Sequence, residues 1–412
     1  MSVVDTAPTR LLDGLRADGR PVPIAEHVEQ YGPLPVEVRP EELRRRIAES
    51  GLTGRGGAAF PTAAKLESVL GGRTRPIVVA NGAEGEPPSG KDKVLLAYAP
   101  HLVIDGALLA ARATGAKQVV IATTSAVHAA VAHALAERPR EGGIAVQTTT
   151  VPDRFVAGEE TALVQFLNGG PALPTFTPPR PYERGVGGAP TAVLNVETLA
   201  HLALIGRFGG ASFRAAGTPS EPGSALVTVS GAVLEPGVYE IALGSSFEAL
   251  LAQAGADGSA QAYLVGGYFG TWVKAADLRG AAISNASIAR FGASLGARAI
   301  VVLPADACGI VETARVARYL AEQSAGQCGP CVHGLAAIAS SLEQLVQRGR
   351  HTPDAGLLRR RLAQVARRGA CRHPDGAVAL VASALRVFSD ELDRHLHGRR
   401  CTGHARAVLP IP

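Results

Sequence analysis

The sequence predicts a layered α/β domain with a largely parallel sheet, then a small β-grasp-like module, then a helical region. Three observations support this prediction. Short apolar runs alternate with helical patterns over residues 77–150, which is typical of a parallel sheet covered by helices. Two strands, a helix and another strand fit within residues 225–265, as in a β-grasp module. From residue 310 to about 396 the pattern is helical.

The chain is expected to begin with an arm, because residues 1–39 contain several prolines and little periodicity. The α/β domain is expected at 40–215. Pro40–Ser50 begins like a helix, since proline and two acids occupy its first turn. Gly51 ends this helix, and a glycine-rich loop follows as far as Thr62.

The expected elements of the α/β domain follow in chain order. Strands are predicted at 77–80, 118–124 and 144–150, helices at 100–115 and 125–137, and further helix starts at 158 and 195. A polar loop of residues 81–93 follows the first strand. Because ligands of open α/β sheets bind at the carboxyl ends of strands, this loop is a candidate site.

The second half of the chain is expected to contain two domains after a linker at 216–223. The β-grasp-like module is placed at 222–300 and the helical domain at 305–400. Within the module, strands are predicted at 225–230, 237–241 and 263–265, and a helix at 245–255.

Composition limits the function classes. Of 412 residues, 46% are hydrophobic and 19% charged, as in globular proteins. The net charge of +5 is too small to indicate nucleic-acid binding. No stretch is apolar enough for a membrane-spanning helix, and the first twenty residues lack the apolar core of a signal peptide. A cytoplasmic protein without nucleic-acid binding or membrane insertion is therefore expected.

The glycine-rich loop is the first candidate site. Gly54, Gly56 and Gly57 let the backbone pass close to a ligand and direct N–H groups toward an anion. Arg55 lies among them and Lys65 follows shortly after, so a phosphate-bearing cofactor would fit. The match to a dinucleotide fingerprint is weak, because a helix and not a strand precedes the loop. A flexible surface loop is the alternative.

Two acidic segments are further candidates. Asn81 could bond a polar ring edge, and Glu84 and Glu86 could accept hydroxyl groups, although a solvated acidic turn explains them equally well. Glu159 and Glu160 stand at a predicted helix start, where complementing the helix dipole is a sufficient structural reason for them.

The cysteines form a metal-like pattern. Five cysteines, an odd number, argue against a disulfide framework. Cys328 and Cys331 form a C-x-x-C motif and Cys371 follows, which suits zinc or an iron–sulfur cluster. His333 and His373 each lie two residues after a cysteine, so a zinc site with three cysteines and one histidine competes. Three buried free cysteines remain the structural alternative.

Five segments, in order over residues 40–395, resemble one family. They are GLTGRGGAAFPTAAK, NGAEGEPPSGKDK, GEETAL, GGAPTAVLNVETLA and QCGPC followed by Cys371. The family is the NADH-binding flavoprotein subunit of respiratory complex I (the F subunit of NADH-quinone oxidoreductase), with its relatives in NAD-linked hydrogenases and formate dehydrogenases. The resemblance implies an FMN-binding α/β domain, a β-grasp (soluble-ligand-binding) module and a helical iron–sulfur domain.

The resemblance also implies a role for each candidate residue. The FMN phosphate and ribityl chain would be held by Gly54, Arg55, Gly56, Gly57 and Lys65. Further flavin contacts would come from Asn81, Glu84, Gly158, Glu159 and Asn195. NADH would face Phe60, Glu86 and Glu160. A [4Fe–4S] cluster would be bound by Cys328, Cys331 and Cys371.

The sequence departs from the family pattern at the cluster. The first cysteine position of the family holds Ala325 here, so one usual ligand is replaced. The cluster could resemble [3Fe–4S], could recruit Cys308, Cys401 or a histidine, or could be absent.

Other departures affect the nucleotide side. The aspartate that the family has two residues after the loop asparagine is Ala83. A second aromatic after the glycine loop falls near Ser68, and a lysine and a phenylalanine of the proline-rich loop fall near Thr177 and Arg180. FMN binding is therefore better supported than NADH binding.

The resemblance implies an oxidoreductase that passes electrons from NAD(P)H through FMN to an iron–sulfur cluster and on to a protein acceptor, such as a ferredoxin or a quinone-linked partner. Residues 345–412 carry thirteen arginines against five acids, which would steer an acidic acceptor. Ala325 and Ala83 motivate an alternative, a degenerate FMN-binding scaffold subunit without NADH turnover. A zinc-stabilised relative is the third possibility.

Overall fold

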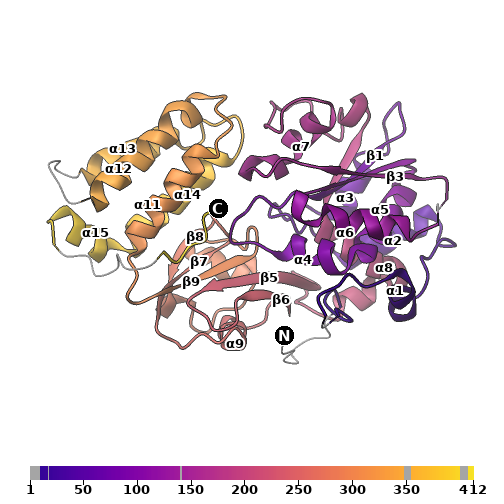
Figure 1. Cartoon of the computed structure of the whole chain (residues 1–412), viewed down its shortest axis with the longest axis horizontal. Helices are drawn as coiled ribbons and strands as arrows, with labels where there is room; N and C mark the ends of the chain where they lie inside the picture. Colours follow the sequence, from indigo (N-terminus) through magenta and orange to yellow (C-terminus); the bar gives the residue numbers. More distant parts are fainter. Residues whose placement is uncertain (1–9, 17, 140–141, 348–353, 400–406) are drawn as a thin grey trace. The chain divides into compact units, whose positions relative to one another are not determined.

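The fold comes from a computed structural model that describes every residue except 1–9, 17, 140–141, 348–353 and 400–406. Its contacts divide the chain into two compact units. The first contains residues 1–85, 90–226 and 240–245, and the second contains residues 86–89, 227–239 and 246–412. Figure 1 labels the elements of both units.

The first unit is built on a four-stranded parallel sheet, in the order β3-β2-β1-β4. The strands are β1 (Ile77–Gly82), β2 (Gln118–Thr123), β3 (Ala145–Thr150) and β4 (Thr191–Asn195). The chain proceeds outward from β1 to β3 and then crosses to β4 on the other side of β1. The strand order therefore reverses between β1 and β4, and such switch points are where open α/β sheets bind ligands.

Helices cover both faces of this sheet (Figure 1). They are α2 (Pro40–Ser50), α3 (Thr62–Glu67), α4 (Lys91–Tyr98), α5 (Pro100–Thr114), α6 (Ser125–Ala136), α7 (Glu160–Leu167) and α8 (Val196–Arg214). On one face, α5 and α8 pack against β1 and against each other. On the other, apolar residues of β1, β2 and β4 contact Leu163 and Val164 of α7. Among the described residues, no single helix could cross a bilayer by length and apolarity; only α4 and α5 taken together, bent by 97°, meet that test.

Helices α1 (Ile24–Tyr31), α3 and α4 and strand β4 of the first unit are absent from the sequence prediction. Helix α1 lies in the segment expected to be an irregular arm. Its buried residue is His27, whose Nε2 lies 2.7 Å from an Asp105 carboxylate oxygen, so the helix has no apolar stripe to reveal it. Strand β4 leads directly into α8, and no turn residue marks its end. Strand β1 is two residues longer than predicted, which places Asn81 in the strand and not in the loop.

A five-stranded mixed sheet, in the order β6-β5-β9-β7-β8, lies mostly in the second unit. Its strands are β5 (Ser224–Gly231), β6 (Gly237–Ala242), β7 (Ala260–Val265), β8 (Thr271–Lys274) and β9 (Ala299–Pro304), with helix α9 (Phe247–Gln253). Strands β5 and β9 pair in parallel at the centre, and β7 is antiparallel to β8 and β9. This agrees with the expected β-grasp-like module, although β8 and β9 were not predicted. The apolar run of β9 is a buried-strand signal that could have found it.

Helices fill the rest of the second unit. The longer ones are α11 (Gly309–Glu322), α12 (Ala336–Val346), α13 (Ala355–Val365), α14 (His373–Val387) and α15 (Ser389–Leu396). Trp272 of β8 is fully buried among them. Its Nε1 donates to Thr313 of α11 at 3.0 Å, and its ring meets the edge of Phe388 at a centroid distance of 5.1 Å. The sheet and the helices thus share one core, and the finer division into domains at 222–300 and 305–400 remains a prediction.

Candidate functional site

Two asparagines stand opposite each other at the switch point of the parallel sheet. Asn81 of β1 and Asn195 of β4 are register partners at the carboxyl ends of their strands. The Asn81 Nδ2 donates to the Gly158 carbonyl at 2.8 Å, which joins β1 to the segment before α7. The Asn195 Oδ1 accepts the Glu197 N–H at 3.0 Å and so caps α8. The predicted flavin residues Asn81, Gly158 and Asn195 therefore lie close together.

The glycine-rich loop passes the same point. A Cβ built on Gly56 would lie 3.3 Å from the Cβ of Asn195, so the loop lies against the end of β4. Gly56 and Gly57 are exposed, and Gly57 has a φ of +106°. The loop is closed by the Gly54 N–H, which donates to the Phe60 carbonyl at 2.8 Å. Its backbone is thus free to approach a ligand at the switch point.

Arg55 takes a different position from the one that the resemblance implies. Its side chain is buried, with only 1% of the residue exposed. The guanidinium donates to the Ser224 carbonyl at 3.0 Å and stacks over the Phe213 ring, while the Arg55 N–H donates to Thr198 Oγ1 at 2.8 Å. Arg55 therefore anchors the glycine loop to the protein interior, and only its backbone lies in the loop.

Lys65 and Glu160 form an ion pair, with Nζ and Oε2 2.9 Å apart. About a quarter of the Lys65 side chain is exposed, so an incoming phosphate would share it with Glu160. The neighbouring Glu159 is the cap of α7, because its carboxylate accepts the N–H groups of Thr161 and Ala162 at 2.9 and 3.0 Å. Burial raises the pKa of Glu159. The cap interpretation of Glu159 is thus what the geometry shows.

The two acids of the second loop accept backbone N–H groups as well. Glu84 is buried, and its carboxylate accepts the N–H groups of Asp92 and Lys93 at 3.2 Å each, at the start of α4. Glu86 belongs to the second unit, where its Oε1 accepts the Tyr268 N–H at 2.7 Å. Glu84 therefore fixes the loop after β1, and Glu86 fixes a glycine turn.

A buried charge cluster lies below Asn195, and sequence reasoning missed it. The Lys91 Nζ donates to Asp92 at 2.6 Å and pairs with Glu197 at 3.0 Å, and all three side chains are almost fully buried. The Asn195 Nδ2 donates to the other Asp92 oxygen at 2.6 Å. Burial raises the pKa of Asp92 to about 7 against the opposing effect of Lys91, and Glu84 raises it further. The rarity of lysine in this chain was the available signal.

Asp92 predicts a pH dependence of stability. Its folded pKa of about 7 lies above the value of roughly 3.9 expected in the unfolded chain. Between these values the folded state keeps a proton that the unfolded state releases, so stability should fall as the pH rises from about 4 to 7. In Asp92→Asn the free energy of unfolding should depend less on pH over this range. The altered hydrogen bonds change its absolute value but not this difference in slope. Urea denaturation across that range measures it, and equal slopes in both proteins would refute the assignment.

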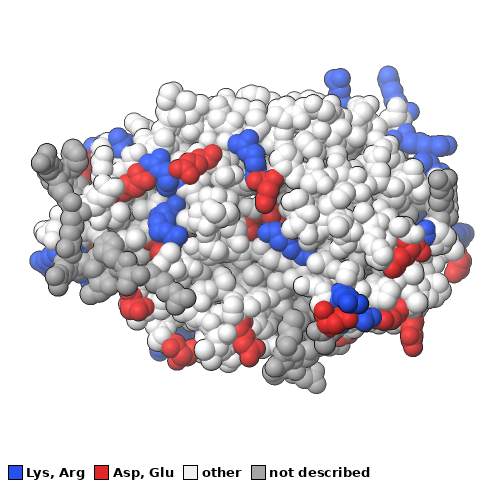
Figure 2. Space-filling model, viewed as in Figure 1, with Lys and Arg blue, Asp and Glu red and all other residues white. Residues whose placement is uncertain are grey.

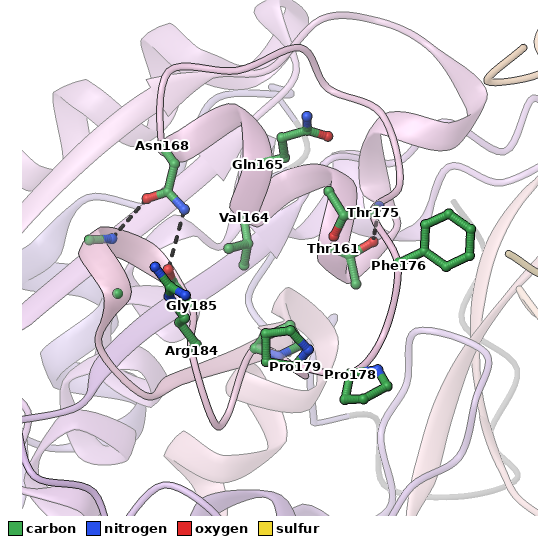
Figure 3. A pocket seen from close by; sticks show the side chains of 13 residues that line it. Thr161, Val164, Gln165, Asn168, Thr175, Phe176, Pro178, Pro179, Arg184 and Gly185 are labelled. Atoms are coloured by element: carbon green, nitrogen blue, oxygen red, sulfur yellow. Dashed lines mark hydrogen bonds between the residues drawn. The ribbon is translucent and has the colours of Figure 1, made fainter. Parts of the chain in front are cut away.

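A cavity of about 750 Å³ lies between α7 and the proline-rich loop of residues 171–190 (Figure 3). None of the predicted site residues lines it. Asn168 holds the loop there, donating to the Gly185 carbonyl at 3.2 Å and accepting the Gly187 N–H at 2.8 Å (Figure 3). The Gln165 Oε1 is buried without a hydrogen-bond partner. The Arg184 side chain also lines the cavity, which places a cation at its wall.

The three predicted cluster ligands gather in the second unit. Cys328 follows α11, Cys331 lies in a short π-helix (Pro330–Leu335), and Cys371 precedes α14. The pKa of Cys331 is raised to about 12, first by burial and then by the charges of Cys328 and Cys371. Burial opposes ionisation of Cys328, yet hydrogen bonds to the backbone of Ala370 and Cys331 lower its pKa below the ordinary value. Such donors favour the thiolate, which is the ligating form.

The described residues do not form a zinc site. A tetrahedral zinc with Zn–S bonds of about 2.3 Å needs thiolates roughly 3.8 Å apart. Within the described ranges, no three His, Cys, Asp or Glu side chains are grouped tightly enough to hold a metal ion. His373 is buried with its Nε2 2.7 Å from the Leu320 carbonyl, so that nitrogen is engaged. The zinc alternative therefore gains no support.

Cys308 stands apart from the other cysteines. It caps the start of α11, where its Sγ lies 3.3 Å from the His395 Nε2. The His373 contact to Leu320 places Cys371 at the opposite end of α11. At 1.5 Å per residue, Cys308 and Leu320 are roughly 18 Å apart. Cys308 is thus not a fourth ligand, and Cys401 lies outside the described residues.

Three sequence families match the chain. Residues 47–204 match the Nuo51 FMN-binding domain, 226–258 the SLBB domain, and 312–395 the NADH-ubiquinone oxidoreductase-F iron-sulfur binding region. The chain is 30% identical over 387 residues to an F subunit of NADH-quinone oxidoreductase of Rhizobium meliloti (the one numbered 2), covering 89% of this chain and 92% of that protein. It is 30% identical over 379 residues to the F subunit of the Streptomyces coelicolor enzyme, covering 88% and 84%.

Solved structures give the same result. Crystal structures of NAD+-reducing [NiFe]-hydrogenase superpose with a TM-score of 0.83 in the air-oxidised state and 0.84 in the H2-reduced state. They are 29% and 30% identical to the chain, of which they cover 92% and 95%, and the chain covers 67% of each. These findings confirm the resemblance, the α/β fold class, and the expected FMN-binding and iron–sulfur-binding regions, with NAD(H) binding in the family.

Proposed function

Because the chain belongs to the family of the NADH-quinone oxidoreductase F subunit, we propose that it takes electrons from NAD(P)H through FMN to an iron–sulfur cluster and on to a protein acceptor. One observation carries the flavin part of the proposal. The exposed glycine loop, Asn81 and Asn195 meet at the switch point between β1 and β4. A chain with that arrangement can surround a phosphate-bearing ring system.

The residues of the first unit divide the work of holding FMN. The N–H groups of Gly56 and Gly57 suit the phosphate, Gly54 closes the loop that presents them, and Lys65 adds a positive charge. Asn81 and Asn195 offer amides at the strand ends. FMN, when bound, accepts two electrons and releases them singly.

The residues proposed to contact NADH include exposed and partly exposed side chains. The Phe60 side chain is exposed (54% of the residue), and such a ring can stack on a planar base or nicotinamide. Glu160, held by Lys65, can accept ribose hydroxyls. Glu86 is proposed to face NADH as well.

The acceptor is proposed to be an acidic protein, such as a ferredoxin or another oxidoreductase subunit. Arg367, Arg368 and Arg372 flank Cys371 and are exposed, so a local positive charge surrounds one proposed cluster ligand. On the face drawn in Figure 2, basic and acidic side chains are interspersed. Steering would therefore act through this local group, and reduction of the acceptor should slow with added salt. The proposal places the chain in the cytoplasm.

An anaerobic absorption spectrum before and after NADH tests the proposal. Flavin bands that bleach, with a broad iron–sulfur shoulder, are the expected result; NADPH run in parallel decides between the two donors. In Cys371→Ser, flavin bleaching should persist while electron delivery to the protein acceptor is lost. Gly329→Ala is the matched control, since a Cβ there meets no atom within 4 Å.

The second candidate is the degenerate scaffold subunit without NADH turnover. The Lys65–Glu160 ion pair favours this candidate, because Glu160 already neutralises the ammonium group that would attract a phosphate beside the glycine loop. Flavin bands that ignore both nucleotides would support the scaffold. Steady-state NADH oxidation with an artificial acceptor would exclude it.

A further inference from the structure

The number of thiolates near the proposed cluster is smaller than such a cluster normally uses. A [4Fe–4S] cluster is held by four cysteines. Three of the five cysteines, Cys328, Cys331 and Cys371, lie near one another. The Cys331 N–H donates to the Cys328 carbonyl at 3.0 Å, and the backbone of Ala370, next to Cys371, bonds to the Cys328 thiol. The fourth iron must therefore find its ligand elsewhere.

Cys308 is excluded by the packing of two antiparallel helices. Helix α14 begins beside the end of α11, through the contact of His373 with the Leu320 carbonyl. It ends beside the start of α11, where a Cβ built on Gly309 would lie 2.2 Å from the Phe388 ring. Cys308 precedes α11 and Cys371 precedes α14. The two cysteines therefore lie at opposite ends of the helix pair.

The two histidines near the cysteines differ in their availability. His373 is 2% exposed and uses its Nε2 at the Leu320 carbonyl, and its ring meets the edge of Phe269. His333 is exposed. In the loop before Cys328, the family's first cysteine position holds Ala325, and the backbone of the next residue, Gly326, bonds to the Cys331 thiol.

We propose that the chain holds its cluster by three thiolates, and that the fourth iron carries an exchangeable anionic ligand from solution, such as hydroxide or a small thiolate. The exposed Arg367, Arg368 and Arg372 stand within four residues of Cys371 in the sequence. Arg372 lies 3.7 Å from Asp375, yet the net charge of this segment is positive and favours an anion. The inference rests on the proposed function, because it presupposes that the iron–sulfur region is loaded.

An iron without a protein ligand should be lost more easily than the other three when the cluster is oxidised. A one-electron oxidant such as ferricyanide would remove one electron, so that [4Fe–4S]2+ becomes [3Fe–4S]+ and one Fe2+ leaves. The electron reduces ferricyanide to ferrocyanide, and the charges balance. Without a fourth protein thiolate, that iron would leave more readily than an iron of a four-thiolate cluster.

The test uses the full chain loaded anaerobically with iron and sulfide, then treated with one equivalent of ferricyanide. We expect release of one Fe2+ per cluster to a ferrous chelator and the near-isotropic paramagnetic resonance signal of an oxidised three-iron centre. Ala325→Cys should suppress both the release and the signal. Gly329→Ala, a change within the same loop, should leave both as in the parent chain.

Further variants decide the origin of the fourth ligand. Cys308→Ala, Cys401→Ala and His333→Ala should each behave like the parent chain. If the parent keeps four irons under ferricyanide and one of these variants does not, that residue is the fourth ligand and the inference is wrong. If no iron or sulfide binds, the iron–sulfur part of the proposed function fails together with the inference.

Discussion

Replacing Lys91 by methionine is expected to lower the free energy of unfolding by about 3–5 kcal/mol, because it leaves buried carboxylates without their cation. The Lys91 side chain is 3% exposed, and that of Glu197, 3.0 Å from its Nζ, is fully buried. Asp92 can respond by binding a proton, since its pKa is already raised to about 7 by burial. Glu197 lies in the first turn of α8, two residues after Asn195. A change at Glu197 should therefore disturb Asn195 and lower the affinity for FMN as well.

Lys93→Met is the matched control for Lys91→Met. Lys93 lies two residues along the same helix and is half-buried, and its backbone, not its ammonium, bonds to Glu84. Urea denaturation of both variants without added FMN measures the difference. The Lys91 variant should regain part of its stability below pH 7. Equal losses in the two variants would show that the buried ion cluster contributes nothing of its own.

Gly158→Ala is expected to weaken FMN binding by about fivefold to a hundredfold while the first unit remains folded. A Cβ at Gly158 would lie 2.3 Å from the Ala83 carbonyl oxygen. That oxygen belongs to the backbone and cannot turn aside as a side-chain tip would, so the segments after β1 and before α7 must separate. Overpacking of this kind typically costs about 1–3 kcal/mol, and 1.4 kcal/mol corresponds to a tenfold change in affinity. The Asn81 bond to the Gly158 carbonyl would be strained by the same movement.

The ratio of flavin to protein after gel filtration, followed by an FMN titration, measures this effect. Gly71→Ala is the control, because a Cβ at Gly71 meets no atom within 4 Å. Wild-type flavin content in the Gly158 variant would mean that the junction of Asn81 and Gly158 does not shape the flavin site.

Local signals allowed much of the fold to be predicted. Helices α2 and α5 end where expected because Gly51 and Gly115 adopt the left-handed conformation, with φ of +68° and +74°. Helix α1 escaped because it depends on the buried His27–Asp105 contact, which no local pattern shows. Strand β4 escaped although its short apolar run is a local signal, because it leads directly into α8.

The sequence predicted which segments form the candidate site. It did not predict which partner each side chain of those segments takes. Arg55 and Glu84 look equally available in the sequence, yet one bonds to a carbonyl at Ser224 and the other caps α4. A polar side chain takes whichever partner the fold brings near, and the partner of Arg55 is far away in the sequence.

The sequence by itself determined the family, the order of the cofactor-binding segments and the three candidate cluster cysteines, because glycine spacing, helix starts and C-x-x-C motifs are local. Only the tertiary structure decided that Asn81 and Asn195 face each other, since their strands come together only in the sheet. It also decided that Lys91 holds a buried charge cluster and that Cys308 is out of reach of Cys371. The physical reason is that strand register and helix length set the distances between groups that the sequence leaves open.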